Sequence, residues 1–246
     1  MFYYLLAPIM SYNYILILAA VIPALFLMAR VYKSDHLEKE SPQLLYTLMR
    51  AGILSSLLAL VEERILVTIL NMYVEPNTVK YNVILYFGIV ALAEESSKYI
   101  FLRYNSWNNR EFNCLYDGVV YAVFVSLGFA LWENISYVLN YGFSAALARA
   151  VTAIPGHACF GVFMGVFYGF AKKYDFAGEK GKSTFFTILS LLIPMAIHGA
   201  YDYIATLEQT DTGWYFLAFV VVLFIISFIL VSSSSKDDHV ITPTGR

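Results

Sequence analysis

The sequence predicts an all-α, polytopic membrane protein, a bundle of about seven transmembrane helices. The first observation is composition: the chain is 59% hydrophobic and 14% charged, with a mean hydropathy of +0.64. These values lie far outside those of soluble proteins. The second is that the apolar residues form seven runs, each long enough, at about 1.5 Å per residue, to cross a hydrocarbon core of about 30 Å. With a net charge of -2, nothing supports nucleic-acid binding.

Short polar connections separate the seven runs. We expect helices over residues 12–32, 44–71, 81–104, 116–139, 145–171, 184–207 and 214–231. The first run is not expected to be a cleavable signal peptide, because no basic residue precedes it, whereas Arg30 and Lys33 follow it. One membrane domain is expected over residues 1–235, with the motif core at 81–207. The polar residues 236–246 are expected to be disordered.

The basic residues predict the orientation of the bundle. They follow the first, third and fifth runs and recur in the C-terminal tail: Arg30, Lys33, Lys39, Arg103, Arg110, Lys172, Lys173, Lys180, Lys182, Lys236 and Arg246. Connections rich in lysine and arginine stay in the cytoplasm. We therefore expect the N-terminus outside and the C-terminus in the cytoplasm of a multi-pass protein, in a prokaryotic plasma membrane.

Four of the hydrophobic runs contain polar or charged residues that a bilayer makes costly. In chain order these are Glu94, Glu95, Lys98, Glu133, Asn134, His157, His198 and Asp202. A charge at mid-bilayer costs roughly 2.5–3.5 kcal/mol on insertion scales. Counted from the expected cytoplasmic ends, one such residue from each run lies about 20 Å deep at about 1.5 Å per residue. We therefore expect the four runs to share one polar site.

Helical spacing suggests pairs within this set. Lys98 follows Glu94 by four residues and Glu95 by three, so its ammonium can reach either carboxylate. One acid is then neutralised, while the other is free to hold a water or a proton, as a general base must. His198 and Asp202 are also four residues apart, a spacing that lets a carboxylate fix the imidazole tautomer.

Other polar residues have less specific interpretations. Asn134 stands beside Glu133 and can hold a polarised carbonyl oxygen. His157 shares a helical stripe with Gly161, Gly165 and Gly169, so it is expected to face protein rather than lipid. Three charged residues late in the second run are expected to pair locally or to reach the interface, and we leave them out of the site: Glu62, Glu63 and Arg64. Asp117 is interpreted as a helix-start residue.

Three kinds of function fit intramembrane charges. Any one of these residues, taken alone, is equally consistent with a structural bridge between helices. A proton- or ion-coupled transporter uses the same side chains, although no inverted repeat or broken helix is evident in the sequence. A non-catalytic scaffold would bind partner helices through the glycine stripe. An enzyme accounts best for the whole set.

Four ordered motifs carry a family resemblance. They are Glu94-Glu95-x-x-Lys98, Phe129-x-x-x-Glu133-Asn134, Pro155-x-His157 and His198-x-x-x-Asp202. Together they cover about residues 91–203 and resemble the PrsW family of intramembrane proteases, in the CAAX-protease and bacteriocin-processing superfamily. The resemblance implies hydrolysis of a peptide bond in a membrane-anchored protein, in the best-known case an anti-sigma factor. Glu133 stands where the wider superfamily usually has histidine, so prenylated CAAX substrates are not expected.

The resemblance also implies roles for the residues. Glu94 and Glu95 become the catalytic acids, one of which activates water. His198, oriented by Asp202, assists proton transfer or stabilises the oxyanion. The remaining members complete the polar cavity: Glu133, Asn134 and His157, with Lys98 in support.

A metal is the alternative to glutamate chemistry. Two histidines and two carboxylates, from Glu94, His157, His198 and Asp202, form a set that can bind zinc with an open position. Because the H-E-x-x-H motif is absent, the sequence favours chemistry without a required cofactor.

Overall fold

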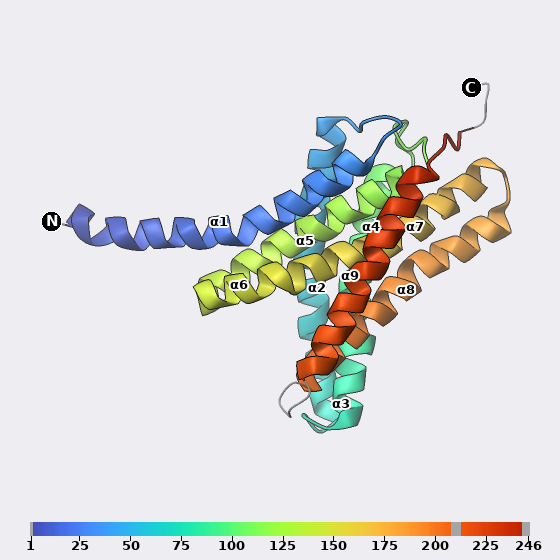
Figure 1. Ribbon diagram of the computed structural model, residues 1–246. Helices are drawn as coiled ribbons and strands as arrows, with labels where there is room; N and C mark the ends of the chain where they lie inside the picture. Colours follow the sequence, from blue (N-terminus) through green and yellow to red (C-terminus); the bar gives the residue numbers. More distant parts are fainter. Residues whose placement is uncertain (1, 208–212, 243–246) are drawn as a thin grey trace.

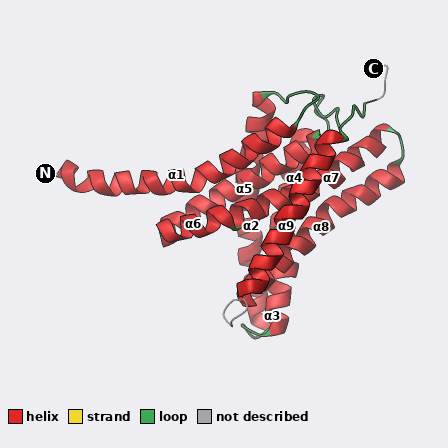
Figure 2. Cartoon of the chain, viewed as in Figure 1, coloured by secondary structure: helices red, strands yellow, loops and turns green. Residues whose placement is uncertain are grey.

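The computed structural model describes residues 2–207 and 213–242, and within α1 it describes side chains from residue 14 onward. These residues form helices joined by short connections, with one isolated β-bridge, so the all-α expectation is confirmed (Figure 2). The elements are α1 (Phe2–Ser34), α2 (Pro42–Tyr73), α3 (Val79–Val83), the π-helix η1 (Ile84–Val90), α4 (Ala91–Ser106), α5 (Asp117–Tyr141), α6 (Phe143–Val151), α7 (Ala153–Phe176), α8 (Lys180–Thr206) and α9 (Gly213–Lys236).

Five helical segments of the described chain are long and apolar enough to cross a membrane. They are Tyr14–Ser34, Asp117–Tyr141, Phe143–Phe176, Lys180–Thr206 and Gly213–Lys236. The stretches α2 and α3–η1–α4 are also long, but they carry several charged residues and are not among the five. The number seven and the orientation of the termini therefore stay predictions.

The helix expected over residues 145–171 is instead two helices. The chain breaks at Thr152, between α6 and α7, where the backbone has φ -120° and ψ -74°. Pro155 explains the break, because it has no amide hydrogen to donate to the carbonyl of Val151 and its ring crowds that carbonyl. The apolar span expected here is present as Phe143–Phe176, but it is not one uninterrupted helix.

The helix α5 is the centre of the bundle. Figure 1 shows it among α1, α2 and α7, the helices with which it packs, and 83% of its most apolar window is buried. Small residues permit this close packing. A Cβ added at Gly128 of α5 would collide with the backbone carbonyl of Met49 in α2. A Cβ added at Gly165 of α7 would lie 2.5 Å from the carbonyl oxygen of Gly118 in α5.

The C-terminal segment is ordered as far as the structure describes it. The helix α9 continues through four serines to Lys236. Beyond it, the amide of Ile241 donates to the carbonyl of Asn113 (2.7 Å), and the amide of Leu115 donates to the carbonyl of His239 (3.1 Å). Residues up to 242 thus pair with the 113–115 loop, whose buried backbone groups need partners, and the expectation of a disordered tail stays a prediction. Residues 243–246 lie outside the described residues.

We expect Gly165→Ala to destabilise the protein by about 1–3 kcal/mol, the usual cost of overpacking, because backbone atoms of α5 block the added methyl group. Gly181→Ala in α8 is the matched control, since a Cβ there meets nothing within 4 Å. Thermal unfolding of both variants in detergent micelles measures the effect. Equal unfolding temperatures for the two variants would contradict the packing described.

Candidate active site

A cavity of about 410 Å³ lies among the helices that carry the four motifs. Its charged lining residues come from α2, α4, α5, α6, α7 and α8: Glu63, Glu94, Glu133, Arg149, His157, His198 and Asp202. Four runs were expected to deliver polar groups to one place, and the structure brings members of all four to this cavity.

The α4 motif forms a buried ion triplet. The Lys98 ammonium lies 2.7 Å from Glu95 Oε1 and 3.1 Å from Glu94 Oε2, as the helical spacing predicted. Lys98 and Glu95 are fully buried, whereas Glu94 is 7% exposed. Of the two acids, Glu94 lines the cavity and Glu95 does not. The motif therefore presents one carboxylate to the cavity and holds the other within the protein.

His198 is held between carboxylates. Its Nδ1 lies 2.8 Å from Glu95 Oε1, and its Nε2 lies 3.4 Å from Asp202 Oδ2 and 3.9 Å from Glu94 Oε2. The ring also stacks on Phe160, with centroids 4.5 Å apart. The contact expected from Asp202 is present, but Glu95 makes the shorter one. The imidazole is fixed from both nitrogens and from one face.

A second chain of contacts joins α4 to α5, α6 and α7. His157 Nδ1 lies 3.2 Å from Lys98 Nζ, and its Nε2 lies 2.8 Å from Glu133 Oε2. Arg149 Nη2 lies 2.9 Å from the same Glu133 oxygen. Phe129 supports the lysine, whose ammonium lies 4.1 Å from the ring centroid. The two histidines are thus linked through Lys98 and Glu95.

Asn134 does not line the cavity. It is fully buried, its Nδ2 donates to the carbonyl of Ala20 in α1 (2.9 Å), and its Oδ1 accepts from Arg149 Nε (2.9 Å). Adjacent residues of an α-helix point about 100° apart, so Asn134 faces α1 while Glu133 faces the cavity. The structure therefore places Asn134 as a link between α1 and Arg149, away from the position of a polarised carbonyl.

Two cavity residues were missed from the sequence. Glu63 was expected to pair locally or to reach the interface near the outer end of the second run, but it lines the cavity. Arg149 was overlooked, although it is the one arginine in the run 145–171. Because an unpaired charge within a membrane is costly, Arg149 could have been predicted to pair with an acidic residue.

The residues present fit a divalent metal. Glu94, Glu95 and His198 are all buried, and each offers one ligand atom within 4.8 Å of the others. Glu95 Oε2 is buried without a hydrogen-bond partner among the described residues. Two carboxylates and an imidazole are donors that zinc accepts. This grouping differs from the sequence-based ligand set, because it includes Glu95 and omits both His157 and Asp202. The ring nitrogens of His157 face Lys98 and Glu133, and the Asp202 carboxylate lies 3.4 Å from His198 Nε2.

Comparisons with known proteins identify the family. Residues 40–231 match the family described as PrsW family intramembrane metalloprotease. Protease PrsW of Oceanobacillus iheyensis is 32% identical over 188 residues, which is 76% of this chain and 80% of that protein. Protease PrsW of Shouchella clausii is 28% identical over 221 residues, or 90% of this chain and 97% of that protein.

A third relative matches over a shorter stretch. Protease PrsW of Bacillus subtilis is 39% identical over 130 residues, so that alignment spans 53% of this chain and 57% of the relative. No solved structure matches the chain. The apolar helices and the bacterial relatives together identify a multi-pass integral membrane protein of a prokaryotic membrane. The chain belongs to the PrsW family of intramembrane metalloproteases and is a membrane peptidase of that family.

Proposed function

We propose that this chain is an endopeptidase that hydrolyses a peptide bond of a membrane-anchored protein, with water activated at Glu94. One observation carries the assignment of Glu94: of the two motif acids, it is the one whose side chain lines the cavity. A base must lie within hydrogen-bond reach of the water it deprotonates, and the buried Glu95 has no such access.

The neighbouring residues supply the rest of the chemistry. The Glu94 carboxylate takes a proton from water as the water oxygen attacks the scissile carbonyl carbon, and the proton passes to the leaving amide nitrogen as the C–N bond breaks. His198, fixed by Glu95 and Asp202, donates to the oxyanion that forms. Lys98 holds the position of both motif acids.

The family description implies a metal, and the donor set fits one. Glu94, Glu95 and His198 would hold it, and Glu94 and His198 would then be ligands in place of the base and donor roles that they have in the metal-free site. When bound, a divalent metal polarises the scissile carbonyl and lowers the pKa of a bound water. His157 and Glu133, joined at 2.8 Å, remain available to position the substrate on the other side of the cavity.

The orientation is part of the proposal. The connection over residues 34–41, the loop over residues 107–116 and the C-terminal segment lie at one end of the bundle (Figure 1). These segments contain Lys39 and Arg110, and the last turns of α1, α7 and α9 beside them contain Lys33, Lys173 and Lys236. This supports a cytoplasmic location for that end and an N-terminus outside. The substrate class, a single-pass membrane protein such as an anti-sigma factor, follows from the resemblance of the motifs.

A proton-coupled transporter is the second candidate. The observation in its favour is helix interruption, by the π-helix η1 and by the break at Thr152, neither of which was expected from the sequence analysis. Proton-driven flux in proteoliposomes without any proteolysis would favour it over the peptidase.

Glu94→Gln is expected to abolish cleavage without loss of folded protein, because glutamine keeps the shape of the side chain but cannot accept a proton. Glu75→Gln, at an exposed acid outside the cavity, is the matched control and is expected to cleave normally. Quantitative proteomics of host membranes would show a full-length single-pass protein accumulating in the first variant alone. Normal cleavage by Glu94→Gln would overturn the assignment.

Lys98→Met is expected to cost about 3–5 kcal/mol of stability, the usual cost of removing one partner of a buried ion pair. The double variant Lys98→Met/Glu95→Gln is expected to recover part of this loss, because it also removes the carboxylate closest to the lysine. Thermal unfolding of the wild type, of both variants and of Glu95→Gln alone gives a double-mutant cycle, which measures the interaction between Lys98 and Glu95. Strict additivity would show that the two side chains do not interact.

Chelation of the purified protein by 1,10-phenanthroline is expected to abolish cleavage, and added Zn²⁺ to restore it, because the grouped donors fit a divalent metal. His198→Ala is expected to weaken zinc binding in calorimetry, a measurement independent of activity. Full activity after removal of all metal would leave Glu94 as the sole activator of water.

A further inference from the structure

A second cluster of carboxylates lies at the opposite end of α5 from the active site. It is formed by Asp35 and Glu40, in the connection between α1 and α2, and by Asp117, the first residue of α5. Asp117 precedes Glu133 by sixteen residues in the same helix, which is about 24 Å at about 1.5 Å per residue. The cluster is therefore separate from the cavity that holds the catalytic motifs.

The three carboxylates are buried together. Asp35 and Glu40 are each 2% exposed, and Asp117 is fully buried. Each residue offers one ligand atom, and these atoms lie within 4.8 Å of one another. Like charges this close repel each other, and each buried carboxylate that stays ionised costs several kcal/mol unless a cation offsets it.

The protein leaves one oxygen of each carboxylate without a partner. Asp35 Oδ2, Glu40 Oε1 and Asp117 Oδ1 are buried and accept no hydrogen bond from the described residues. The other oxygens of the two latter residues are satisfied: Glu40 Oε2 accepts from the Tyr121 hydroxyl (2.7 Å), and Asp117 Oδ2 accepts from the amide of Cys114 (2.7 Å). Buried polar atoms are nearly always paired, so three such oxygens in one cluster point to a bound cation or, for Glu40 and Asp117, to a proton shared between them.

No cationic side chain of the described residues fills this place. None of the ion pairs found among them involves Asp35, Glu40 or Asp117. The nearby Lys39 ammonium instead contacts the backbone carbonyls of Asp35 and Tyr32. Burial, and then the neighbouring Asp117 carboxylate, raise the pKa of Glu40 to about 9.

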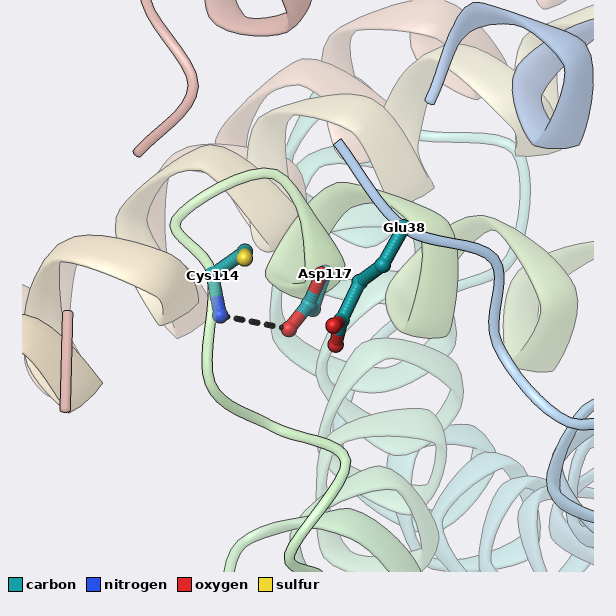
Figure 3. Close-up of side chains that lie close together, drawn as sticks. All are labelled: Glu38, Cys114 and Asp117. Carbon is teal, nitrogen blue, oxygen red and sulfur yellow. Dashed lines mark hydrogen bonds between the residues drawn. The ribbon is translucent and has the colours of Figure 1, made fainter. Parts of the chain in front are cut away.

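We propose that Asp35, Glu40 and Asp117 bind a hard divalent cation, Mg²⁺ or Ca²⁺. Carboxylate oxygens are the ligands that both ions prefer. Figure 3 shows the exposed Glu38 beside Asp117, where it offers a further oxygen, with Cys114 on the other side of Asp117.

The cation would fasten three segments together. Asp35 and Glu40 belong to the connection between α1 and α2, Asp117 starts α5, and the loop before Asp117 pairs with the C-terminal segment. Asp238 of that segment adds one more buried oxygen without a partner, Oδ2, while its Oδ1 accepts from the Tyr116 amide (2.8 Å).

Thermal unfolding of the full-length protein in nanodiscs, freed of metal with EDTA, tests the proposal. Added Mg²⁺ or Ca²⁺ is expected to raise the unfolding temperature of the wild type. Glu40→Gln is expected to lose the cation-dependent rise, because a neutral amide replaces the carboxyl group that would ionise on binding the cation, and to unfold near the wild-type temperature without cation. Asp35→Asn is expected to behave in the same way.

Glu94→Gln is the matched control, because Glu94 lines the active-site cavity, and this variant should keep the cation-dependent rise in unfolding temperature. Calorimetry with the same ions is expected to show binding at least about tenfold weaker in Glu40→Gln than in the wild type. The proposal is overturned if the wild type shows no rise, if Glu40→Gln keeps it, or if Glu94→Gln loses it. If a proton shared by Glu40 and Asp117 balanced the cluster instead of a cation, the wild type would show no rise.

Discussion

The ammonium of Lys98 is the contact on which the active site depends. It is fully buried, it pairs with both motif glutamates, and it lies 3.2 Å from His157 of another helix. In a low-dielectric interior, each of these groups would be costly alone, and together they offset one another. Through Glu95 the network reaches His198, and through His157 it reaches Glu133. Removing the lysine would take away the one ammonium that pairs with both glutamates of α4 and would cut the link between the two histidines.

Local contacts were predictable from the sequence, because an α-helix fixes which residues are neighbours. The spacings of three and four residues correctly gave the pairs that Lys98 makes within α4 and the contact of His198 with Asp202. The rotation of each helix about its own axis was not predictable. It depends on packing against other helices, and for this reason Asn134 faces α1 instead of the cavity.

The depth of a side chain along its helix and the breaks within helices were a second limit on the prediction. Glu63 was left out of the site because it lies late in α2 and was expected to pair locally or to reach the interface. Its depth relative to the motif helices, which changes by about 5 Å per turn, could not be read from the sequence. The break at Thr152 follows from Pro155, a signal that was present in the sequence and outweighed by the continuous hydrophobic run. Hydrophobicity establishes that a segment enters the membrane and says little about its straightness.

The helix α5 carries residues of both polar clusters, so its position affects both of them. Gly118 at one end and Gly128 in its middle let α7 and α2 pack against its backbone, which leaves little room for α5 to slide. Glu133 meets His157 at 2.8 Å only if α5 sits at one height relative to α7. Asp117 anchors the start of the same helix to the 113–114 amides. Whatever balances the charge of the Asp35, Glu40 and Asp117 cluster therefore also fixes the depth at which α5 presents Glu133 to the cavity.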